Sequence, residues 1–272
     1  MDHPLLYEVN ARQWLASLSK KHRRKIQLDN VPSEEIVSLK KLGTTHLWLM
    51  GVWPTGPKSR AQALSHDELR KAYHVALPDW SEDDILGSPY AVQELQVAAS
   101  IGGESSLAIF RQELASHGIK LILDFVPNHL GLDHDWIINH PHLFVGSDHP
   151  FPDAFPLETP EQKRYIAHGK DPYFPGWTDT AQLEYRNDQT REAMTELILS
   201  LTQKCDGVRC DMAMLLISEV FENTWRHVPF EGNRNSAEFW QHSIARAKRI
   251  RPDFLFLAEA YWGLEGRLCE LG

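Results

Sequence analysis

Two carboxylates stand at the ends of apolar, strand-like runs in this chain. Asp211 ends the run GVRCD, and Glu259 ends the run FLFLAE. The side chains of a strand alternate between its faces, so Arg209 and Asp211 share one face with Gly207. A cation beside a carboxyl group favours its charged form. We therefore expect Asp211 to be ionised, as a carboxylate nucleophile must be.

Glu259 follows an apolar run, and apolar surroundings raise the pKa of a carboxyl group, which suits a general acid. One ionised and one protonated carboxyl group at neighbouring strand ends could cleave a glycosidic bond with retention of configuration. One attacks the anomeric carbon, and the other protonates the departing oxygen and then activates water or an acceptor. This mechanism predicts a separation of roughly 5–5.5 Å between the two groups. A single strand-end carboxylate is more often a helix cap or half of a salt bridge. The prediction therefore rests on several such residues occurring together at neighbouring strand ends.

A third apolar run, LILDFVPNHLG, brings further polar side chains to a strand end. It carries Asp124, Asn128 and His129. The carboxyl ends of parallel strands meet at one rim of a sheet, where α/β proteins build their active sites. Three successive strand ends with polar groups therefore predict one site at that rim.

A parallel sheet is needed to bring these residues together. Short apolar runs alternate with helical stretches along the chain, a pattern typical of βαβ units. The predicted strands are Leu5–Val9, His46–Met50, Ile119–Phe125, Gly207–Asp211 and Phe254–Glu259. The predicted helices are Ser33–Leu42, Glu104–His117, Thr190–Gln203 and Ala237–Arg249.

Two connections are too long for plain βα units. Residues 51–103 follow the second predicted strand, and residues 130–189 follow the third. Both come after the carboxyl end of a strand, where insertions commonly build active sites. Within the first, we expect the charged stretch 56–71 to be mobile.

Composition restricts the class of protein. The 272 residues include 28 Lys and Arg against 37 Asp and Glu, a formal net charge of −9. An acidic surface argues against binding to nucleic acid or to anionic membranes. The nine Trp residues have two readings, core packing or stacking on the apolar face of a sugar.

The cysteines indicate a reducing compartment. Cys205, Cys210 and Cys269 are odd in number and include no CxxC pair, which is typical of reduced thiols in a cytoplasmic protein. The chain opens without a basic head and apolar core, and it has no run of 18 apolar residues. We therefore expect no signal peptide, no transmembrane helix and no membrane partner.

Taken in order, these segments resemble the motifs of the α-amylase family of glycoside hydrolases. DFVPNH at 124–129, GVRCD at 207–211 and LAEAYW at 257–262 are similar to its first three motifs. QLEY at 182–185 looks like an auxiliary motif of its inserted lobe, and GSPYAV at 87–92 like the segment whose tyrosine lies under the reacting sugar. Each motif alone is weak, but their order and spacing are specific, and the resemblance covers nearly the whole chain.

The resemblance implies a role for each matching residue. Asp211 would be the nucleophile, Glu259 the acid/base, and Arg209 the partner that orients the nucleophile. His129 would hydrogen bond to a hydroxyl of the reacting sugar, and Tyr90 would stack on that sugar.

Three further residues have implied roles. Asp124 would help to position Arg209. Trp262 would line the leaving-group side, with packing of its own loop as the alternative. Asn128 matches a calcium ligand of those members that have a calcium site, and the alternative is that it fixes a loop by hydrogen bonding. Calcium needs six to eight oxygen ligands, and the sequence does not supply the rest, so we expect no cofactor.

The resemblance also implies the fold, a TIM (β/α)8 barrel, of which the chain supplies five strands. Residues 1–129 would hold strands one to three with a long loop at 51–103, residues 130–189 an inserted lobe after strand three, and residues 190–272 strands four and five. Five strands cannot close a barrel of eight. We therefore expect a barrel truncated after its fifth strand, with open edges.

The family's Asn-His-Asp run, which supplies a third carboxylate, does not occur in the sequence. We expect hydrolysis or transglycosylation of α-glucosidic bonds in oligosaccharides as the chemistry, with little activity from this chain alone. One alternative is a non-catalytic binding or partner module, as in relatives that have lost their carboxylates. Another is that a second polypeptide supplies the missing strands.

Overall fold

The computed structural model describes residues 3–158, 163–232 and 237–272. Its centre is a five-stranded sheet in the order β1-β2-β3-β9-β10, in which every neighbouring pair is parallel. The strands are β1 (Leu6–Asn10), β2 (His46–Met50), β3 (Lys120–Phe125), β9 (Gly207–Cys210) and β10 (Leu255–Ala258). Strand order follows chain order, as in a (β/α) barrel, and the five predicted strands are confirmed.

Helices connect these strands. They are α1 (Ala11–His22), α2 (Ser33–Lys41), α5 (Gly103–Ser116), α7 (Asp188–Lys204), α8 (Ser218–Trp225), α9 (Phe239–Ile250) and α10 (Glu265–Glu270). Four of them, α2, α5, α7 and α9, confirm the predicted helices to within two residues at each end. Helix α1 is an addition to the predicted elements. Its buried residues are only Ala11, Leu15 and Leu18, and seven of its positions are polar. The apolar periodicity is therefore too weak to predict this helix from the sequence.

Burial differs sharply between the middle and the edges of the sheet. In β3 all residues after Lys120 are buried, and β9 is buried throughout. The first three residues of β1 and both ends of β10 are exposed. Unpaired edges and apolar side chains therefore face solvent on both sides of the sheet, as expected for strands that do not close a barrel.

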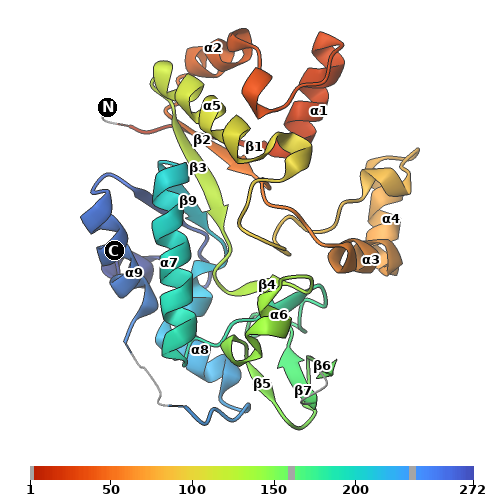
Figure 1. The fold of residues 1–272 in the computed structure, drawn as a ribbon, viewed down its shortest axis with the longest axis vertical. Helices are drawn as coiled ribbons and strands as arrows, with labels where there is room; N and C mark the ends of the chain where they lie inside the picture. Colours follow the sequence, from red (N-terminus) through yellow and green to blue (C-terminus); the bar gives the residue numbers. More distant parts are fainter. Residues whose placement is uncertain (1–2, 159–162, 233–236) are drawn as a thin grey trace.

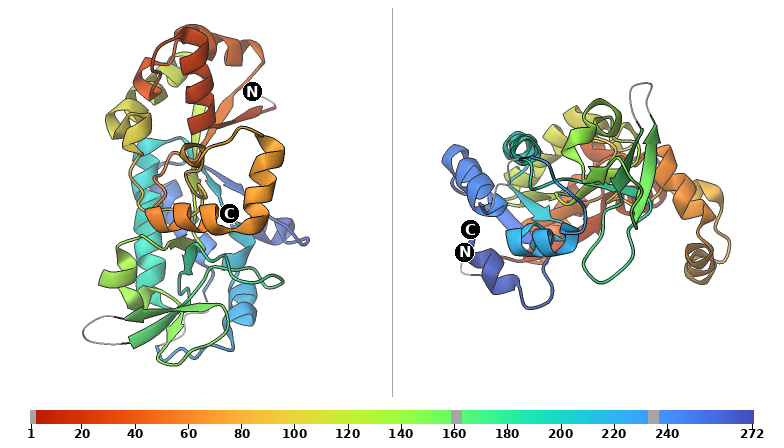
Figure 2. Two further views of the ribbon diagram at one scale, coloured as in Figure 1. Left: turned by 90° about the vertical axis from the view of Figure 1, so that its right-hand side faces the viewer. Right: turned by 90° about the horizontal axis from the view of Figure 1, so that it is seen from below.

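The long connection after β2 projects from the sheet. The segment 56–71, for which we expected mobility, lies mostly in helices α3 (Pro57–Ser65) and α4 (Asp67–Ala76). This pair extends to the side opposite α7 and α9 (Figures 1 and 2). None of the residues of α4 is buried. The chain then returns to the sheet rim through residues 87–92.

The connection after β3 forms two small antiparallel sheets. Strand β4 (His129–Gly131) pairs with β8 (Thr180–Gln182). Strand β7 (Lys163–Ala167) lies between β5 (Gly146–Ser147) and β6 (Ala154–Glu158). With the short helix α6 (Trp136–Asn139) they lie beyond one end of the central strands (Figure 1). The division into an inserted lobe and barrel parts stays a prediction, which this arrangement supports.

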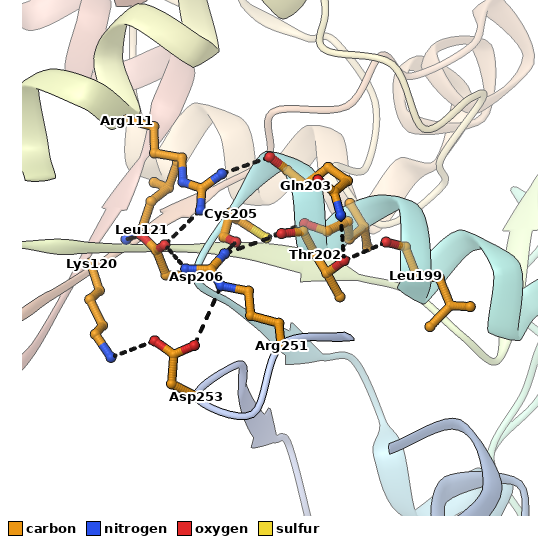
Figure 3. A network of polar contacts seen from close by, with 11 residues as sticks. Arg111, Lys120, Leu121, Leu199, Thr202, Gln203, Cys205, Asp206, Arg251 and Asp253 are labelled. Atoms are coloured by element: carbon orange, nitrogen blue, oxygen red, sulfur yellow. Dashed lines mark hydrogen bonds and ion pairs between the residues drawn. The ribbon is translucent and has the colours of Figure 1, made fainter. Parts of the chain in front are cut away.

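At the opposite ends of the strands, a polar network joins four elements (Figure 3). Asp206, just before β9, accepts hydrogen bonds from Arg111 of α5 at 2.8 Å, from Arg251 after α9, and from the backbone N–H of Leu121 in β3 at 2.8 Å. Arg251 also contacts Asp253 at 3.5 Å. The network fixes where β3, β9 and β10 begin. No helix in the described ranges has both the length and the hydropathy to span a bilayer.

Candidate active site

The sheet register brings the predicted residues to one rim. Asp124 of β3 pairs with Arg209 of β9, and Arg209 pairs with Leu257 of β10. Two residues further on, this register sets Glu259 opposite Asp211. The backbone confirms the alignment, since the Glu259 N–H donates to the Cys210 carbonyl at 3.0 Å. The sequence prediction that successive strand ends meet at one site is therefore confirmed in the structure.

Arg209 connects the two carboxylates. Its Nη1 lies 2.7 Å from Asp211 Oδ1, and its Nη2 lies 2.8 Å from Glu259 Oε2. Glu259 Oε2 also accepts the backbone N–H of Met212 at 2.9 Å. Charge-assisted hydrogen bonds of this length are strong. The guanidinium thus sets the relative positions of the two carboxyl groups.

The ionisation of the pair differs from the sequence-based expectation. Burial is the largest influence on Asp211 and raises its pKa, although Arg209 opposes the shift. Burial also raises the pKa of Glu259, but the N–H of Met212 and the charge of Arg209 outweigh it, so that the pKa is lowered overall. The pKa shifts of the two groups in the free chain therefore run in the opposite directions to those expected from the sequence.

The reason lies in the position of the two strands. Strand β9 is in the buried middle of the sheet, whereas β10 is an edge, and the side chain of Glu259 is 19% exposed against 7% for Asp211. The neighbours of Glu259 at this rim are polar rather than apolar.

Two aromatic rings enclose the guanidinium. Arg209 lies 5.0 Å from the ring centroid of Trp48 and 5.2 Å from that of Tyr90. Asp124 accepts the Trp48 ring N–H at 3.0 Å and the Gly51 N–H at 2.8 Å. The predicted link from Asp124 to Arg209 therefore runs through Trp48. Sequence analysis did not include Trp48, although it lies on the same strand face as Asp124 by the period of two.

Burial keeps two further groups in defined states. The pKa of Asp124 is raised to about 6 by burial, against the two N–H groups that it accepts. Burial lowers the pKa of His129 to about 4, so its ring is neutral at pH 7. The His129 ring lies 5.1 Å from that of Trp177. A neutral imidazole here can exchange hydrogen bonds with a hydroxyl without carrying a charge.

The side chain of Asn128 forms hydrogen bonds with Gln182 of the adjacent strand β8. Its Oδ1 accepts from Gln182 Nε2 at 3.0 Å, and its Nδ2 donates to Gln182 Oε1 at 3.2 Å. Its backbone oxygen accepts from Gln182 and from the N–H of Leu183. A calcium ion needs six to eight free oxygens, and these oxygens face N–H donors instead. The residues present do not fit calcium, and the arrangement supports the loop-fixing alternative.

Two exposed aromatic residues follow the acidic group. The Tyr261 hydroxyl donates to Glu259 Oε1 at 2.9 Å, a contact that sequence analysis did not predict, although period two puts Tyr261 and Glu259 on one face. Trp262 is 42% exposed, so its ring is not used for packing in the core. Its backbone is left-handed, with φ of 66°.

Comparison with known proteins identifies the family. The model described as "Alpha amylase, catalytic domain" matches residues 33–270. The chain belongs to the alpha-amylase family. Members of the alpha-amylase family are glycoside hydrolases with a TIM-barrel catalytic domain, and the five parallel strands agree with part of such a barrel.

Individual alpha-amylase relatives are distant. Alpha-amylase 3 of Dictyoglomus thermophilum is 24% identical over 158 residues, which are 56% of this chain and 28% of that protein. An alpha-amylase structure from Lactobacillus plantarum is 21% identical with a TM-score of 0.61, covering 99% of this chain and 48% of that one. The maltogenic alpha-amylase AmyB of Thermotoga neapolitana is 18% identical with a TM-score of 0.59, covering 97% and 47%. The chain thus spans about half the length of these solved structures.

Proposed function

We propose that this chain carries the nucleophile and the acid/base of a retaining enzyme acting on α-glucosidic bonds of oligosaccharides. The observation that carries the proposal is the single guanidinium of Arg209, bonded to both Asp211 and Glu259. The two carboxylates stay paired there at the carboxyl ends of neighbouring strands, where barrel enzymes hold their catalytic groups. Carboxylates retained in this arrangement argue against a non-catalytic binding module.

The proposed reaction has two steps. Asp211 Oδ forms a bond to the anomeric carbon while the glycosidic bond breaks, and the Glu259 carboxyl proton passes to the departing oxygen. Water or an acceptor hydroxyl then attacks the same carbon, Glu259 takes its proton, and the Asp211 bond breaks. Each step inverts the anomeric carbon, so the product retains the configuration.

In the free chain the pKa of Asp211 is raised and that of Glu259 is lowered, so the protonation of the pair must change before this reaction. A sugar placed between the groups separates Glu259 from Asp211 and covers the exposed side of Glu259. Loss of water around Glu259 raises its pKa, while Arg209 keeps its short bond to Asp211. Substrate binding thus favours the protonated form of Glu259, which the departing oxygen needs.

The other residues of the rim would hold the reacting sugar. His129 is neutral and can hydrogen bond to a hydroxyl, and the ring of Tyr90 can lie under the pyranose. Asp124 fixes Trp48, which in turn supports Arg209. Trp262 would face the leaving group. These roles agree with those implied by the family motifs.

We further propose that the 272-residue chain by itself turns over natural oligosaccharides slowly. The sequence has no Asn-His-Asp run, and the sheet is open at β1 and β10 in the described residues. A second polypeptide that covers these edges is a further hypothesis, which co-expression with candidate partners can test.

An α-glucosyl fluoride assay tests the nucleophile separately from the acid. Fluoride leaves without a proton, so the wild-type chain should release it even where acid assistance is poor. Asp211→Asn should abolish release. Glu259→Gln should still release fluoride but accumulate a glycosyl-protein adduct visible by intact mass, with turnover lowered about 10²–10⁴-fold.

Asp179→Asn is the matched control, because Asp179 is a half-buried carboxylate whose pKa burial also raises but which lies outside the group around Arg209. It should release fluoride at the wild-type rate. Undiminished release by Asp211→Asn would contradict the proposed nucleophile.

A further inference from the structure

The two oxygens of the Glu259 carboxylate have different partners. Oε2 accepts the backbone N–H of Met212 at 2.9 Å and lies 2.8 Å from Nη2 of Arg209. Oε1 accepts the hydroxyl of Tyr261 at 2.9 Å. A carboxylate oxygen has two lone pairs, so the two N–H donors fill those of Oε2, whereas the hydroxyl fills one of those of Oε1. The proton that Glu259 exchanges during the proposed reaction is therefore carried by Oε1.

A tight turn holds Tyr261 beside Glu259. The N–H of Leu264 donates to the carbonyl of Tyr261 at 3.3 Å, which closes a four-residue turn. Its two central residues, Trp262 and Gly263, are both left-handed, with φ of 66° and 74°. A turn of this kind reverses the chain sharply. The chain thus turns back directly after Tyr261, and the position of the tyrosine relative to Glu259 is set by the backbone.

The hydroxyl of Tyr261 acts on the ionised form of Glu259. Its hydrogen bond to Glu259 raises the pKa of Tyr261, so the phenol keeps its proton at neutral pH and remains the donor. Burial raises the pKa of Glu259, whereas the N–H of Met212, the charge of Arg209 and the Tyr261 hydroxyl lower it. A hydroxyl that donates to a carboxylate stabilises its ionised form. Ionised Glu259 is the form that takes a proton in the second step of the proposed reaction.

Other titratable groups act on Glu259 from neighbouring elements. Arg209 and Asp211 belong to β9, and Tyr90 belongs to the segment that returns to the rim after α4. Arg209 favours the ionised form of Glu259, and an ionised Asp211 opposes it. Removal of the Tyr261 hydroxyl leaves these groups in place, so its effect on Glu259 can be measured separately.

We infer that Tyr261 is a positioning residue, whose hydroxyl holds Oε1 of Glu259 in the ionised form that takes a proton in the second step. This inference rests on the proposed function and deepens it. In that step the oxygen of water or of an acceptor bonds to the anomeric carbon, its proton passes to the open lone pair of Oε1, and the bond to Asp211 breaks. In the first step the same hydrogen bond opposes protonation of Oε1. Tyr261 thus favours removal of the glycosyl group from Asp211 over its transfer to Asp211.

The test compares Tyr261→Phe with the wild-type chain, because phenylalanine keeps the ring and removes only the hydroxyl. Release of fluoride from α-glucosyl fluoride is measured against pH. Fluoride leaves without a proton, so the acidic limb of this profile reports ionisation of the base. The limb should move upward by about 0.5–1 pH unit, since the net free energy of one hydrogen bond is close to that of one pKa unit. In the range between the two limbs the variant should accumulate a glycosyl-protein adduct visible by intact mass.

Tyr173→Phe is the matched control. It also removes the hydroxyl of an exposed tyrosine, and the ring of Tyr173 packs against that of Trp262 in the same loop as Tyr261. The acidic limb and the amount of adduct should be those of the wild-type chain. An unshifted limb in Tyr261→Phe, or an equal shift in the control, would overturn the positioning role.

Carboxyl titration by ¹³C NMR separates this inference from the proposed function. The signal of Glu259 is assigned by its loss in Glu259→Gln, and its pKa should be higher in Tyr261→Phe than in the wild-type chain whether or not fluoride is released. An unchanged pKa would contradict the inference. Absence of fluoride release from the wild-type chain, together with the expected NMR shift, would instead count against the proposed function.

Discussion

Arg209 forms ion pairs with two carboxyl groups, those of Asp211 and Glu259, which differ in burial. Asp211 is enclosed by the sheet, so removal from water dominates its ionisation. Glu259 lies on an edge strand and accepts a backbone N–H, a hydroxyl and one guanidinium nitrogen. The same cation therefore leaves the pKa of Asp211 raised and that of Glu259 lowered. The opposite pKa shifts of the two groups in the free chain arise from their positions in the sheet, and not from their residue types.

We expect the isosteric substitutions Asp211→Asn and Glu259→Gln to change the free energy of unfolding in opposite directions. Asp211 binds a proton more tightly when folded, so its contribution to stability falls as pH rises from the unfolded pKa, about 4, through the folded value. Asp211→Asn avoids that loss and should raise the free energy of unfolding at pH 7 by about 1 kcal/mol or more, since one pKa unit is about 1.4 kcal/mol. At pH 3.5 the gain should vanish.

Glu259→Gln is the paired comparison. A lowered folded pKa stabilises the protein above the unfolded pKa, and this contribution is lost as pH falls through the folded value. Glu259→Gln should therefore lower the free energy of unfolding at pH 7. Urea unfolding of both variants at pH 7 and pH 3.5 measures the effects, and changes of the same sign at pH 7 would contradict the assignment.

Asp206 shows how one residue can fix several elements. Its carboxylate accepts hydrogen bonds from Arg111 of α5, from Arg251 in the α9–β10 connection and from a backbone N–H of β3 (Figure 3). This network lies at the amino ends of the strands, where barrel residues serve stability rather than chemistry. By setting the starts of β3, β9 and β10, it sets the level at which Asp211 and Glu259 end.

We expect Asp206→Asn to cost about 1.5–3 kcal/mol at pH 7, the range for hydrogen bonds to a charged group. Burial raises the pKa of Asp206, but Leu121 N–H, Arg251 and Arg111 together lower it below its ordinary value. The stabilisation is thus present above the unfolded pKa and lost as pH falls through the lower, folded one, so the variant should approach wild type once the pH is below the folded pKa. Asp253→Asn, at an exposed member of the network, should change stability by less than about 0.5 kcal/mol. Equal losses in both variants would contradict this role.

The whole molecule has a buried middle and two open sides. Leu6 and Tyr7 of β1 and Leu255 of β10 are 37–40% exposed, next to backbone groups that lack a strand partner on that side in the described sheet. Open edges with apolar side chains pair readily with other chains. The sheet architecture therefore favours association.

We expect the chain to self-associate as its concentration rises, and Leu6→Lys combined with Leu255→Lys to increase the monomer fraction. A lysine on an edge strand opposes pairing by its charge. Sedimentation velocity across a concentration series measures this. Leu42→Lys provides the control, because Leu42 is 61% exposed at the end of α2 and lies outside both edge strands. A wild-type chain that stays monomeric throughout the series would contradict the prediction.

The sequence by itself determined the strands, most of the helices around them and the meeting of Asp124, Arg209, Asp211 and Glu259 at one rim. Apolar runs and period-two alternation are local properties, and parallel strands in chain order convert them into a shared rim. Only the tertiary structure decided which carboxyl group has the raised pKa, because burial depends on whether a strand is central or at an edge. The contact between the rings of Tyr173 and Trp262, which lie in two loops far apart in the chain, also left no mark in the local sequence. Loop paths bring those rings together, and side-chain period does not encode loop paths.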